Sequence, residues 1–395
     1  MRIGFLLNHE AGHQVLHAAP VACELSRRYP AFEVLILVGS PDAATMVQRV
    51  LSLYPDHRCR VVRLRQPRLV AWATTAVSPI VHAGKVARLS ANRGILRQLD
   101  VLVTPEKTSL KLREDPALRH LLLIHTRHGA GDRPVGFDAR AANFDLVLAA
   151  GAKIRDRLVA SGSVAPERCA VVGYPKFDVA PALATPRRPF PNDKPVVLYN
   201  PHYSNAESSW VPMGKAVIDH FVNRDDVNLI FAPHVILYKR PLRHRARPLL
   251  GARRASNIHV DTGSAASQDM SHLLAADIYL GDVSSQVYEF LYAPRPCIFL
   301  DGHNLTEREP SENLRAWSAG EVVDSVRDLP AALARARTDP DGYRDQQRRL
   351  FAETFHQSGD GATAGARAAD AIAAFLRAGD YAASDTADWP AAATG

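Results

Sequence analysis

The chain has 395 residues, of which 47% are hydrophobic and 23% charged, and a formal net charge of +7. This balance is typical of a soluble globular protein, and the length predicts two domains. No run reaches the ~18 to 20 apolar residues that cross a bilayer, and the first ten residues are too polar for a signal peptide. The cysteines lie far apart, so neither a disulfide framework nor a cysteine metal site is expected. We therefore expect a cytoplasmic protein.

The positive charge is concentrated in three runs, 58–69, 85–99 and 239–254. Such runs bind nucleic acid, anionic lipid or phosphorylated ligands, or form a solvated basic face. The sequence has no zinc-finger spacing, RNP-like strand or helix-turn-helix signature, so nucleic acid is not an expected partner. The segment 69–89 mixes apolar residues with basic ones, which indicates either core packing or contact with a membrane surface. We expect peripheral attachment to an anionic membrane surface, on the inner face of the cell membrane.

Short apolar runs alternate with helical patterns in the first half of the chain. Helical patterns cover 18–28 and 152–162. The runs typical of buried parallel strands are 2–7, 33–39, 100–104, 120–126, 144–151 and 169–175. This βαβ series predicts a doubly wound, Rossmann-like domain over residues 1–179.

A proline-rich stretch without periodicity, 180–194, indicates a linker. The alternation then restarts with a helix near 212–223 and with apolar runs at 196–201, 227–234, 257–261, 276–280 and 296–301. These runs predict a second Rossmann-like domain over 195–378. Small and polar residues predict a disordered tail over 379–395. The expected fold class is α/β, with two parallel sheets and a ligand cleft between the domains.

The stretch GDVSSQVYEF places polar residues between an expected strand and an expected helix. Asp282 or Ser284 can cap this helix, which leaves the backbone N–H groups of Ser285 and Gln286 to bind an anion. A helix start attracts phosphate through its dipole and amides, although a plain cap is the ordinary use of these residues. Glu289, one turn further on, can accept hydrogen bonds from ribose hydroxyls. The stretch predicts a phosphate site or, alternatively, only a capped helix.

Three other strand ends carry histidine, which takes or gives a proton near neutral pH. The residues that follow these strands are His128 and Gly129; Asn200 and His202; and His234 with Lys239 and Arg240. A single histidine at such a place is more often structural than catalytic. Ligands of open α/β sheets bind beyond the carboxyl ends of the strands, however, and three such ends indicate a shared site.

The sequence HEAGH satisfies the H-E-x-x-H zinc-protease pattern, with His9 and His13 as ligands and Glu10 as base. It follows the first strand directly, Gly12 weakens a helix there, and no third ligand is evident. A loop in which Asn8, His9 and His13 line the cleft between the domains, at the place where an acceptor substrate would bind, is the favoured interpretation. No metal and no cofactor are expected.

Taken together, these motifs resemble the CDP-glycerol glycerophosphotransferase family, the teichoic-acid-type polymerases and primases, over about residues 120–375. HTRHGAG is similar to the family's histidine-glycine motif, and LYNPHYS to its Tyr-Ala-Pro segment. FAPH resembles its His-Pro region in reversed order, and GDVSSQVYEF its Asp-Tyr-Ser-Ser motif. VVGYPKFD and GDGATAGAR resemble two further landmarks. The resemblance implies a GT-B fold, with an acceptor domain followed by a nucleotide-donor domain.

The resemblance also implies roles for single residues. It implies that His128 acts as, or beside, the base on the acceptor hydroxyl, and that His234 lies against the donor diphosphate. Ser284 and Ser285 would bind phosphate, and Glu289 takes the place of the family's acidic residue near the nucleotide sugar. The chain departs from the family pattern at Arg127, Ala130 and Val283. These departures leave the acceptor and the transferred group open.

The expected reaction moves glycerol phosphate, or a related polyol phosphate, from a CDP-activated donor to a hydroxyl of a cell-surface glycan or lipid precursor, without a metal. A histidine accepts the hydroxyl proton, and an imidazolium at His234, nearby Lys239 or Arg240, and the helix-start amides stabilise the leaving phosphate. A GT-B glycosyltransferase, an isomerase of the UDP-sugar 2-epimerase kind and a non-catalytic nucleotide-sugar-binding protein remain alternatives, because all of them share a diphosphate site.

Overall fold

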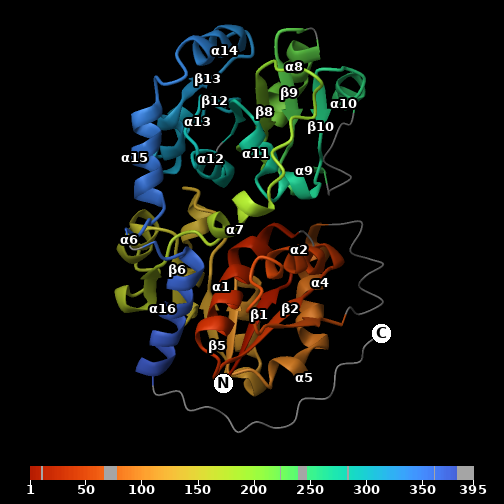
Figure 1. Ribbon diagram of the computed structural model, residues 1–395. Helices are drawn as coiled ribbons and strands as arrows, with labels where there is room; N and C mark the ends of the chain where they lie inside the picture. Colours follow the sequence, from red (N-terminus) through yellow and green to blue (C-terminus); the bar gives the residue numbers. More distant parts are fainter. Residues whose placement is uncertain are drawn as a thin grey trace.

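Two α/β domains lie one above the other in the computed structural model (Figure 1). The structure describes residues 1–9, 12–65, 78–222, 224–238, 247–282, 284–359 and 361–379. Within them, the N-terminal domain has a seven-stranded sheet of order β3-β2-β1-β4-β5-β6-β7 and the C-terminal domain a six-stranded sheet of order β10-β9-β8-β11-β12-β13. Neighbouring strands pair in parallel in both sheets. The expected α/β fold with two parallel sheets is confirmed.

The strands agree closely with the apolar runs of the sequence. Those of the N-terminal sheet are β1 (Arg2–Leu7), β2 (Glu33–Val38), β3 (Arg60–Arg63), β4 (Val101–Thr104), β5 (Leu122–His125), β6 (Leu146–Ala149) and β7 (Cys169–Val171). Those of the C-terminal sheet are β8 (Val196–Asn200), β9 (Asn228–Phe231), β10 (Ile258–Val260), β11 (Ile278–Gly281), β12 (Cys297–Leu300) and β13 (Glu321–Val323). The sequence did not indicate β3 and β13, because these edge strands are short and partly exposed and have no continuous apolar run.

Helices cover both faces of each sheet. Those described in the N-terminal half are α1 (Val15–Arg28), α2 (Pro41–Leu51), α4 (Ser78–Ala91), α5 (Arg93–Leu96), α6 (Ala152–Ala160) and α7 (Lys176–Leu183). Those described in the C-terminal half are α8 (Trp210–Val222), α9 (Val235–Tyr238), α10 (Arg247–Ala252), α11 (Ser271–Ala275), α12 (Ser285–Phe290), α13 (Leu305–Arg308), α14 (Leu329–Thr338), α15 (Arg344–Thr354) and α16 (Ala364–Ala378).

Successive side chains of a strand point to opposite faces of its sheet, which explains why helices pack on both faces. In β1, Ile3 and Phe5 are buried in the core beneath α1 and α2, whereas Leu6 belongs to the core on the opposite face, beneath α4 and α5. In β8, Leu198 and Tyr199 likewise belong to the cores on the two faces of the second sheet. Strands buried on both faces read as continuous apolar runs, which is why the sequence indicates them so clearly.

The last helix, α16, returns to the N-terminal domain. It packs along α1, and its Ala368, Ala369 and Ile372 are buried in the same core as β1. Figure 1 shows this blue helix at the level of the N-terminal sheet. The expected C-terminal span of 195–378 placed it with the other sheet. The small residues of α16 permit a close approach to the alanines of α1, and the sequence pattern does not say on which domain such a face packs.

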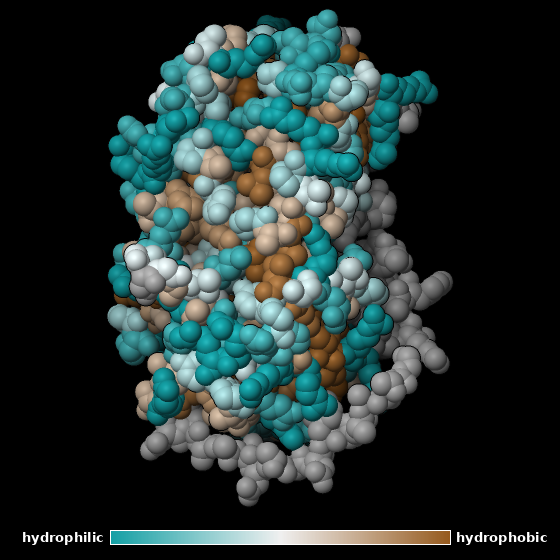
Figure 2. All heavy atoms as spheres, viewed as in Figure 1, coloured by the Kyte–Doolittle hydropathy of each residue, from teal (hydrophilic) through white to brown (hydrophobic). Residues whose placement is uncertain are grey.

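Two other features bear on the expected domain limits. Helix α7 extends to Leu183, so the chain is helical at the beginning of the expected 180–194 linker. The tail from residue 380 lies outside the described residues. No helix in the described part of the chain has the length and apolarity needed to span a bilayer. Figure 2 shows a largely hydrophilic face on which an apolar band begins near the junction of the domains and continues over the N-terminal domain.

Candidate functional site

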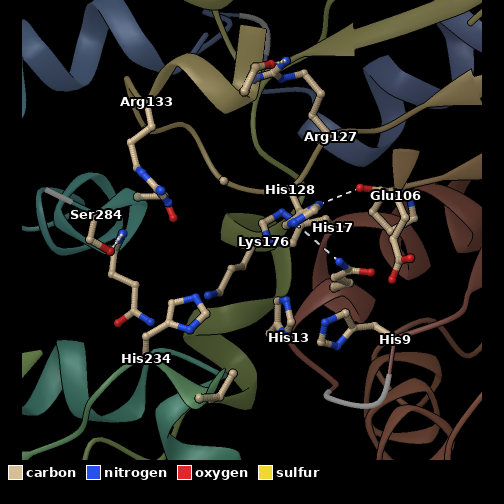
Figure 3. Close-up of a pocket in the computed structure, with 18 of the residues that line it drawn as sticks. His9, His13, His17, Glu106, Arg127, His128, Arg133, Lys176, His234 and Ser284 are labelled. Atoms are coloured by element: carbon tan, nitrogen blue, oxygen red, sulfur yellow. Dashed lines mark hydrogen bonds between the residues drawn. The ribbon is translucent and has the colours of Figure 1, made fainter. Parts of the chain in front are cut away.

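A cleft with a volume of about 450 Å³ lies between the two domains, at the carboxyl ends of the central strands. Residues from both domains line it. In Figure 3, His9, His13, His17 and His128 gather on one side, and His234, Ser284 and Arg133 lie across from them. The chain therefore brings its histidine-bearing strand ends together at one place, as the sequence predicts.

His128 has a defined hydrogen-bonding geometry. Its Nδ1 lies 2.6 Å from the carbonyl oxygen of Pro105, an acceptor, so Nδ1 carries the proton and Nε2 keeps its lone pair. The amide nitrogen of Gln14 lies 3.4 Å from that Nε2. The ring is open to the water of the cleft but surrounded by protein, and this burial lowers the pKa of His128 below 6.5, against the opposing effects of Pro105 and Glu106. His128 is therefore neutral at pH 7.

Three more histidines extend this wall of the cleft. The rings of His9 and His13 lie 4.6 Å apart, and those of His13 and His128 lie 6.0 Å apart, measured between centroids. His17 stacks edge-on against Tyr174 at 4.9 Å. Burial first, and then the neighbouring imidazoles, holds the pKa of His13 well below its usual value. His13, His17 and His128 thus present neutral imidazoles, which donate or accept hydrogen bonds without repelling one another.

The H-E-x-x-H interpretation does not agree with this arrangement. A zinc protease carries both histidines on one helix. Here α1 begins at Val15 after a 3₁₀ turn over Gly12–Gln14, and His9 precedes both. His9 and His13 therefore do not share a helix. Glu10, the base of that pattern, lies outside the described residues.

A buried ion pair, Glu106 with Lys85, lies close to His128. Glu106 accepts a 2.9 Å hydrogen bond from the ammonium group of Lys85 and a 2.6 Å one from the hydroxyl of Thr108. Burial alone would raise the pKa of Glu106, but Lys85, His9 and these hydrogen bonds together lower it. A carboxylate is thus fixed beside the imidazole. Nothing in the sequence around Glu106 indicated this role, because its partner Lys85 lies 21 residues away, in a run interpreted as a basic surface.

The helix start after β11 forms the opposite wall. Ser284 caps α12, and its hydroxyl accepts a hydrogen bond from the backbone N–H of Gln286 at 3.2 Å. The glycine loop of the N-terminal domain lies directly against Ser285. A Cβ added at Gly129 would meet the Ser285 side chain at 3.1 Å, and one at Gly131 would meet the Ser285 backbone at 3.4 Å. The two motifs that the sequence singled out are therefore in contact across the cleft.

Two histidines and an ion pair complete the C-terminal wall. The rings of His202 and His234 lie 5.6 Å apart. Arg133, from the N-terminal domain, donates a 2.9 Å hydrogen bond to Glu207 and reaches Nε2 of His202 at 3.0 Å. Burial first, and then the positive charge of Arg133, lowers the pKa of His234 to about 3. His234 is therefore neutral in the protein without ligand, in contrast to the imidazolium expected from the sequence.

Glu289 is buried in the cleft wall and already has two partners. Its carboxylate oxygens accept hydrogen bonds from the hydroxyl of Tyr174 at 2.8 Å and from the ammonium group of Lys176 at 2.7 Å. Both partners belong to the VVGYPKFD segment: Tyr174 precedes α7, and Lys176 is its first residue. The pair therefore joins the N-terminal half to α12, and Glu289 reaches a ligand only with the lone pairs that remain.

Three expected site residues do not line the cleft. Asn8 is buried and holds Lys85 and Arg88, Asn200 binds the backbone of Ala232, and Asp282 accepts hydrogen bonds from the backbone N–H groups of His202 and Ser209. These residues position the loops that carry the lining residues. Burial raises the pKa of the Asp282 carboxyl to about 7. Arg240 and Lys239 lie outside the described residues.

The lining also contains residues that sequence reasoning missed. They include Gln14, His17, Lys85, Glu106, Lys107, Arg127, Arg133, Arg140 and Lys176. Lysine and arginine outnumber acidic residues among all the lining side chains, which suits an anionic ligand. Arg127 has a positive φ of 47° and its guanidinium donates to the carbonyl of Gly136, so it shapes the loop after β5.

Comparison with known proteins agrees with these observations. Residues 104–373 match the model of the family described as CDP-Glycerol:Poly(glycerophosphate) glycerophosphotransferase. A search of curated protein sequences finds no match.

Solved structures of similar fold include two kinds of enzyme. The wall teichoic acid polymerase TagF superposes with a TM-score of 0.62 at 15% identity, over 96% of this chain and 90% of that one. A co-structure of S. aureus MnaA with UDP gives a TM-score of 0.62 at 15% identity, over 95% and 97%. A putative UDP-N-acetylglucosamine 2-epimerase from Listeria monocytogenes gives 0.60 at 15%, over 98% and 99%. At such identities the likeness shows the fold, which is of the GT-B type.

Proposed function

Because this chain belongs to the CDP-glycerol:poly(glycerophosphate) glycerophosphotransferase family, we propose that it transfers glycerol phosphate, or a related polyol phosphate, from a CDP-activated donor to a hydroxyl of a cell-surface glycan or lipid precursor. The observation that carries the proposal is the contact between the His128–Gly131 loop and Ser285 across a cationic cleft. A histidine-to-asparagine variant of TagF soaked with CDPG is among the structures of similar fold.

In this proposal His128 is the general base. The hydrogen bond from Nδ1 to Pro105 fixes the ring in the tautomer whose Nε2 carries the lone pair, and an acceptor hydroxyl would take the place of the long 3.4 Å contact from the Gln14 amide, which lines the same cleft. As the acceptor hydroxyl attacks the donor phosphorus, Nε2 takes the hydroxyl proton, and the bond from phosphorus to the nucleotide oxygen breaks. The positive charge that develops on the imidazole is stabilised by the Glu106 carboxylate nearby. Such a base contributes a rate factor of roughly 10² to 10⁴.

The nucleotide leaves as a phosphate with increased negative charge. Ser284 and Ser285, with the backbone at the start of α12, lie in the lining opposite His128, as does His234. His234 is neutral before the donor binds, so it acts first as an N–H donor, and a bound diphosphate offsets the repulsion from Arg133 that lowers its pKa. The ammonium group of Lys176, which is paired with Glu289, belongs to the same lining.

We extend the proposal to a membrane-associated acceptor. Arg93 and Arg97 of the expected 85–99 basic run are exposed and can face anionic lipid, although Arg93 pairs with Asp115. Lys85 and Arg88 of the same run point inward instead, toward Glu106 and Asn8. Residues 69–77, the first part of the segment 69–89 that was expected to contact a membrane surface or to pack in the core, lie outside the described residues. Salt-sensitive flotation of the protein with anionic vesicles tests this part alone.

Replacement of His128 by Asn tests the reaction. Transfer of radiolabelled glycerol phosphate from CDP-glycerol to a teichoic-acid-type primer is expected to fall by at least ~10², while CDP-glycerol still raises the melting temperature of the variant as it does that of the parent. His356→Gln, at an exposed site outside the cleft, serves as the control and retains activity. Equal rates for the His128→Asn variant and the parent would contradict the proposal.

The choice of donor is tested with a panel of CDP-glycerol, CDP-ribitol, UDP-sugars and GDP-sugars. A ligand at one hundred times its dissociation constant adds about 2.7 kcal/mol to the free energy of unfolding, which a thermal shift detects. Stabilisation by CDP-polyols supports the proposal. Stabilisation by UDP-sugars alone, with release of free nucleotide and no use of acceptor, would instead indicate an isomerase of the kind that shares this fold.

A further inference from the structure

A second group of metal-ligating side chains lies in the C-terminal domain, outside the lining of the main cleft. His259 is on the edge strand β10, Asp261 follows that strand, and His272 is on α11. One ligand atom from each lies within 4.8 Å of the other two. Asp261 and His272 are buried and His259 is partly buried. In the part of the chain that the structure describes, no other three such residues meet in this way.

Hydrogen bonds hold Asp261 and His272 in place, so the group is not a set of surface charges that approach one another by chance. Nε2 of His272 lies 2.6 Å from Oδ2 of Asp261. The other oxygen, Oδ1, accepts hydrogen bonds from the backbone N–H groups of Gly263 at 2.9 Å and Ser264 at 2.8 Å, so the carboxylate cannot swing away. The rings of His259 and His272 lie 5.7 Å apart. Oδ2, which also accepts a hydrogen bond from the Ser264 hydroxyl, thus lies close to two imidazoles from two elements.

From this geometry we propose that His259, Asp261 and His272 bind a divalent transition-metal ion of the zinc type. Two imidazole nitrogens and one carboxylate oxygen are a donor set that suits Zn²⁺, Co²⁺ and Ni²⁺. Metal–ligand bonds of about 2 Å place tetrahedral ligand atoms about 3.3 Å apart. The ligand atoms of His272 and Asp261, now 2.6 Å apart, therefore move apart slightly, and ligand atoms that are now up to 4.8 Å apart close in by up to about 1.5 Å. The ion replaces the hydrogen bond between His272 and Asp261 and links the two residues directly.

The surroundings leave room for a further ligand. His259 and Asp261 line an open cavity of about 510 Å³, which Arg253, Thr262 and Ser264 also line. Water can enter such a cavity and take the fourth coordination position. Arg253 lies near this opening, which favours a bound hydroxide or another anion as the fourth ligand. The proposed site is therefore open on one side, and bound metal can exchange with solution.

The ion would stabilise a loop that reaches the main cleft. The chain between Asp261 and His272 carries Ser267 and Gln268, and both line that cleft. The amide nitrogen of Gln268 donates to the carbonyl of Ser264 at 3.2 Å, so the position of Gln268 follows that of the loop. A metal that joins β10 to α11 fixes both ends of this loop. The role we assign to it is structural support of the donor domain, separate from the transfer chemistry.

Titration of the full, tag-free chain with Co²⁺ tests the proposal. We compare the parent with His259→Gln and with the control His356→Gln, whose side chain is exposed and far from the group in sequence. The parent and the control are expected to bind one more equivalent of Co²⁺ than His259→Gln, with the intense visible absorption of four- or five-coordinate cobalt. Any binding to the histidines of the main cleft occurs in all three proteins and cancels in the comparison.

Affinity for this equivalent is expected to fall in His259→Gln by at least the ~10- to 100-fold that is typical of losing an outer-shell partner. Zn²⁺ is expected to displace the cobalt and to raise the melting temperature of the parent and the control, but not of His259→Gln. His272→Gln, checked for native circular dichroism, should match His259→Gln. Equal binding in the parent and His259→Gln, or a spectrum of fully hydrated cobalt throughout, would overturn the proposal. None of these measurements uses the transfer reaction. A failure of the metal-site proposal is therefore distinguishable from a failure of the proposed function.

Discussion

Glu106 is the residue whose charge most directly tunes the proposed base. Its carboxylate raises the pKa of His128, whereas burial, the largest effect, and Lys85 lower it. Glu106→Gln removes the negative charge and leaves that of Lys85 unopposed, so the pKa of His128 falls further. The acid limb of the pH–rate profile is therefore expected to move to lower pH, and the rate at neutral pH to fall by about 10-fold, because a weaker base accepts the proton less readily.

The matching variant Glu106→Asp keeps the charge and should restore most of the rate and the original pH profile. Nucleotide-dependent thermal shifts are expected to stay unchanged in both variants, because Glu106 lies on the side of the cleft away from α12. A Glu106→Gln enzyme with the parent's profile would show that the carboxylate only holds Lys85.

At the scale of residues, the sequence predicted which residues line the cleft better than it predicted what each side chain does. His128, His234, Ser284, Ser285 and Glu289 all line the cleft, because polar residues that follow buried strands share one edge of a sheet. The pairing of Glu106 with Lys85 depends on a helix that packs over the end of β4, which no local pattern encodes. Asn200 and Asp282 look like ligand contacts in the sequence, yet their side chains satisfy backbone groups.

At the scale of elements, the contact between the glycine loop and α12 makes a paired prediction. Gly129 has a φ of +80°, and a Cβ there would lie 3.1 Å from Ser285, whereas Gly131 has no positive φ and ordinary contact at 3.4 Å. Gly129→Ala is therefore expected to lower the free energy of unfolding by about 1–2 kcal/mol through the left-handed backbone alone. It should also weaken the thermal shift caused by CDP-glycerol, because Ser285 is displaced.

Gly131→Ala is the control and should lower the free energy of unfolding by less than half as much, measured by urea denaturation. If both substitutions act equally, the loop moves freely and the contact with Ser285 does not hold it.

Elements with strong periodicity were predictable, and those defined by tertiary contacts were not. The buried strands of both sheets and the start of α12 follow from apolar runs and capping residues. Strands β3 and β13 depend on a neighbour to pair with, and their side chains are mostly polar or partly exposed. Helix α16 has a clear apolar face, but only the folded chain shows that this face packs on α1.

At the scale of the whole molecule, Asp178 attaches α16 to the N-terminal domain. Its carboxylate accepts hydrogen bonds from the backbone N–H groups of Ala364 at 3.1 Å and Gly365 at 2.7 Å, at the start of α16. Burial nevertheless raises the pKa of Asp178 from 3.8 to about 6. The folded chain then binds this proton more tightly than the unfolded chain, so the contribution of Asp178 to stability falls as pH rises from about 4 to 6.

Asp178→Asn, which cannot ionise but keeps an acceptor oxygen, should remove this contribution. Urea denaturation of both proteins at several pH values between 4 and 7 measures it. The free energy of unfolding of the parent relative to the variant is expected to decrease across this range. A difference that increases with pH would mean that the hydrogen bonds to α16 outweigh burial and that the pKa is lowered instead.

The buried pair between Lys176 and Glu289 makes the two domains interdependent. Lys176 begins α7, which packs against α1, and Glu289 lies in α12 of the other domain. Lys176→Met leaves the Glu289 carboxylate buried with the hydroxyl of Tyr174 as its remaining partner in this network. Breaking such a pair costs about 3–5 kcal/mol, because the uncompensated charge stays out of water. We expect this loss in the free energy of unfolding, together with separate transitions for the two domains.

The double variant Lys176→Met/Glu289→Met removes both charges and should recover most of that loss, since apolar side chains of similar volume replace a buried pair at little cost. Lys215→Met breaks the exposed pair with Asp219 and is the matched control, with an expected change of only ~0–1 kcal/mol. Lys176→Met and the double variant both alter the lining of the cleft, so the free energy of unfolding rather than the transfer rate is the informative measurement. A double variant as unstable as Lys176→Met would mean that the geometry of the pair, and not the isolated charge, holds the domains together.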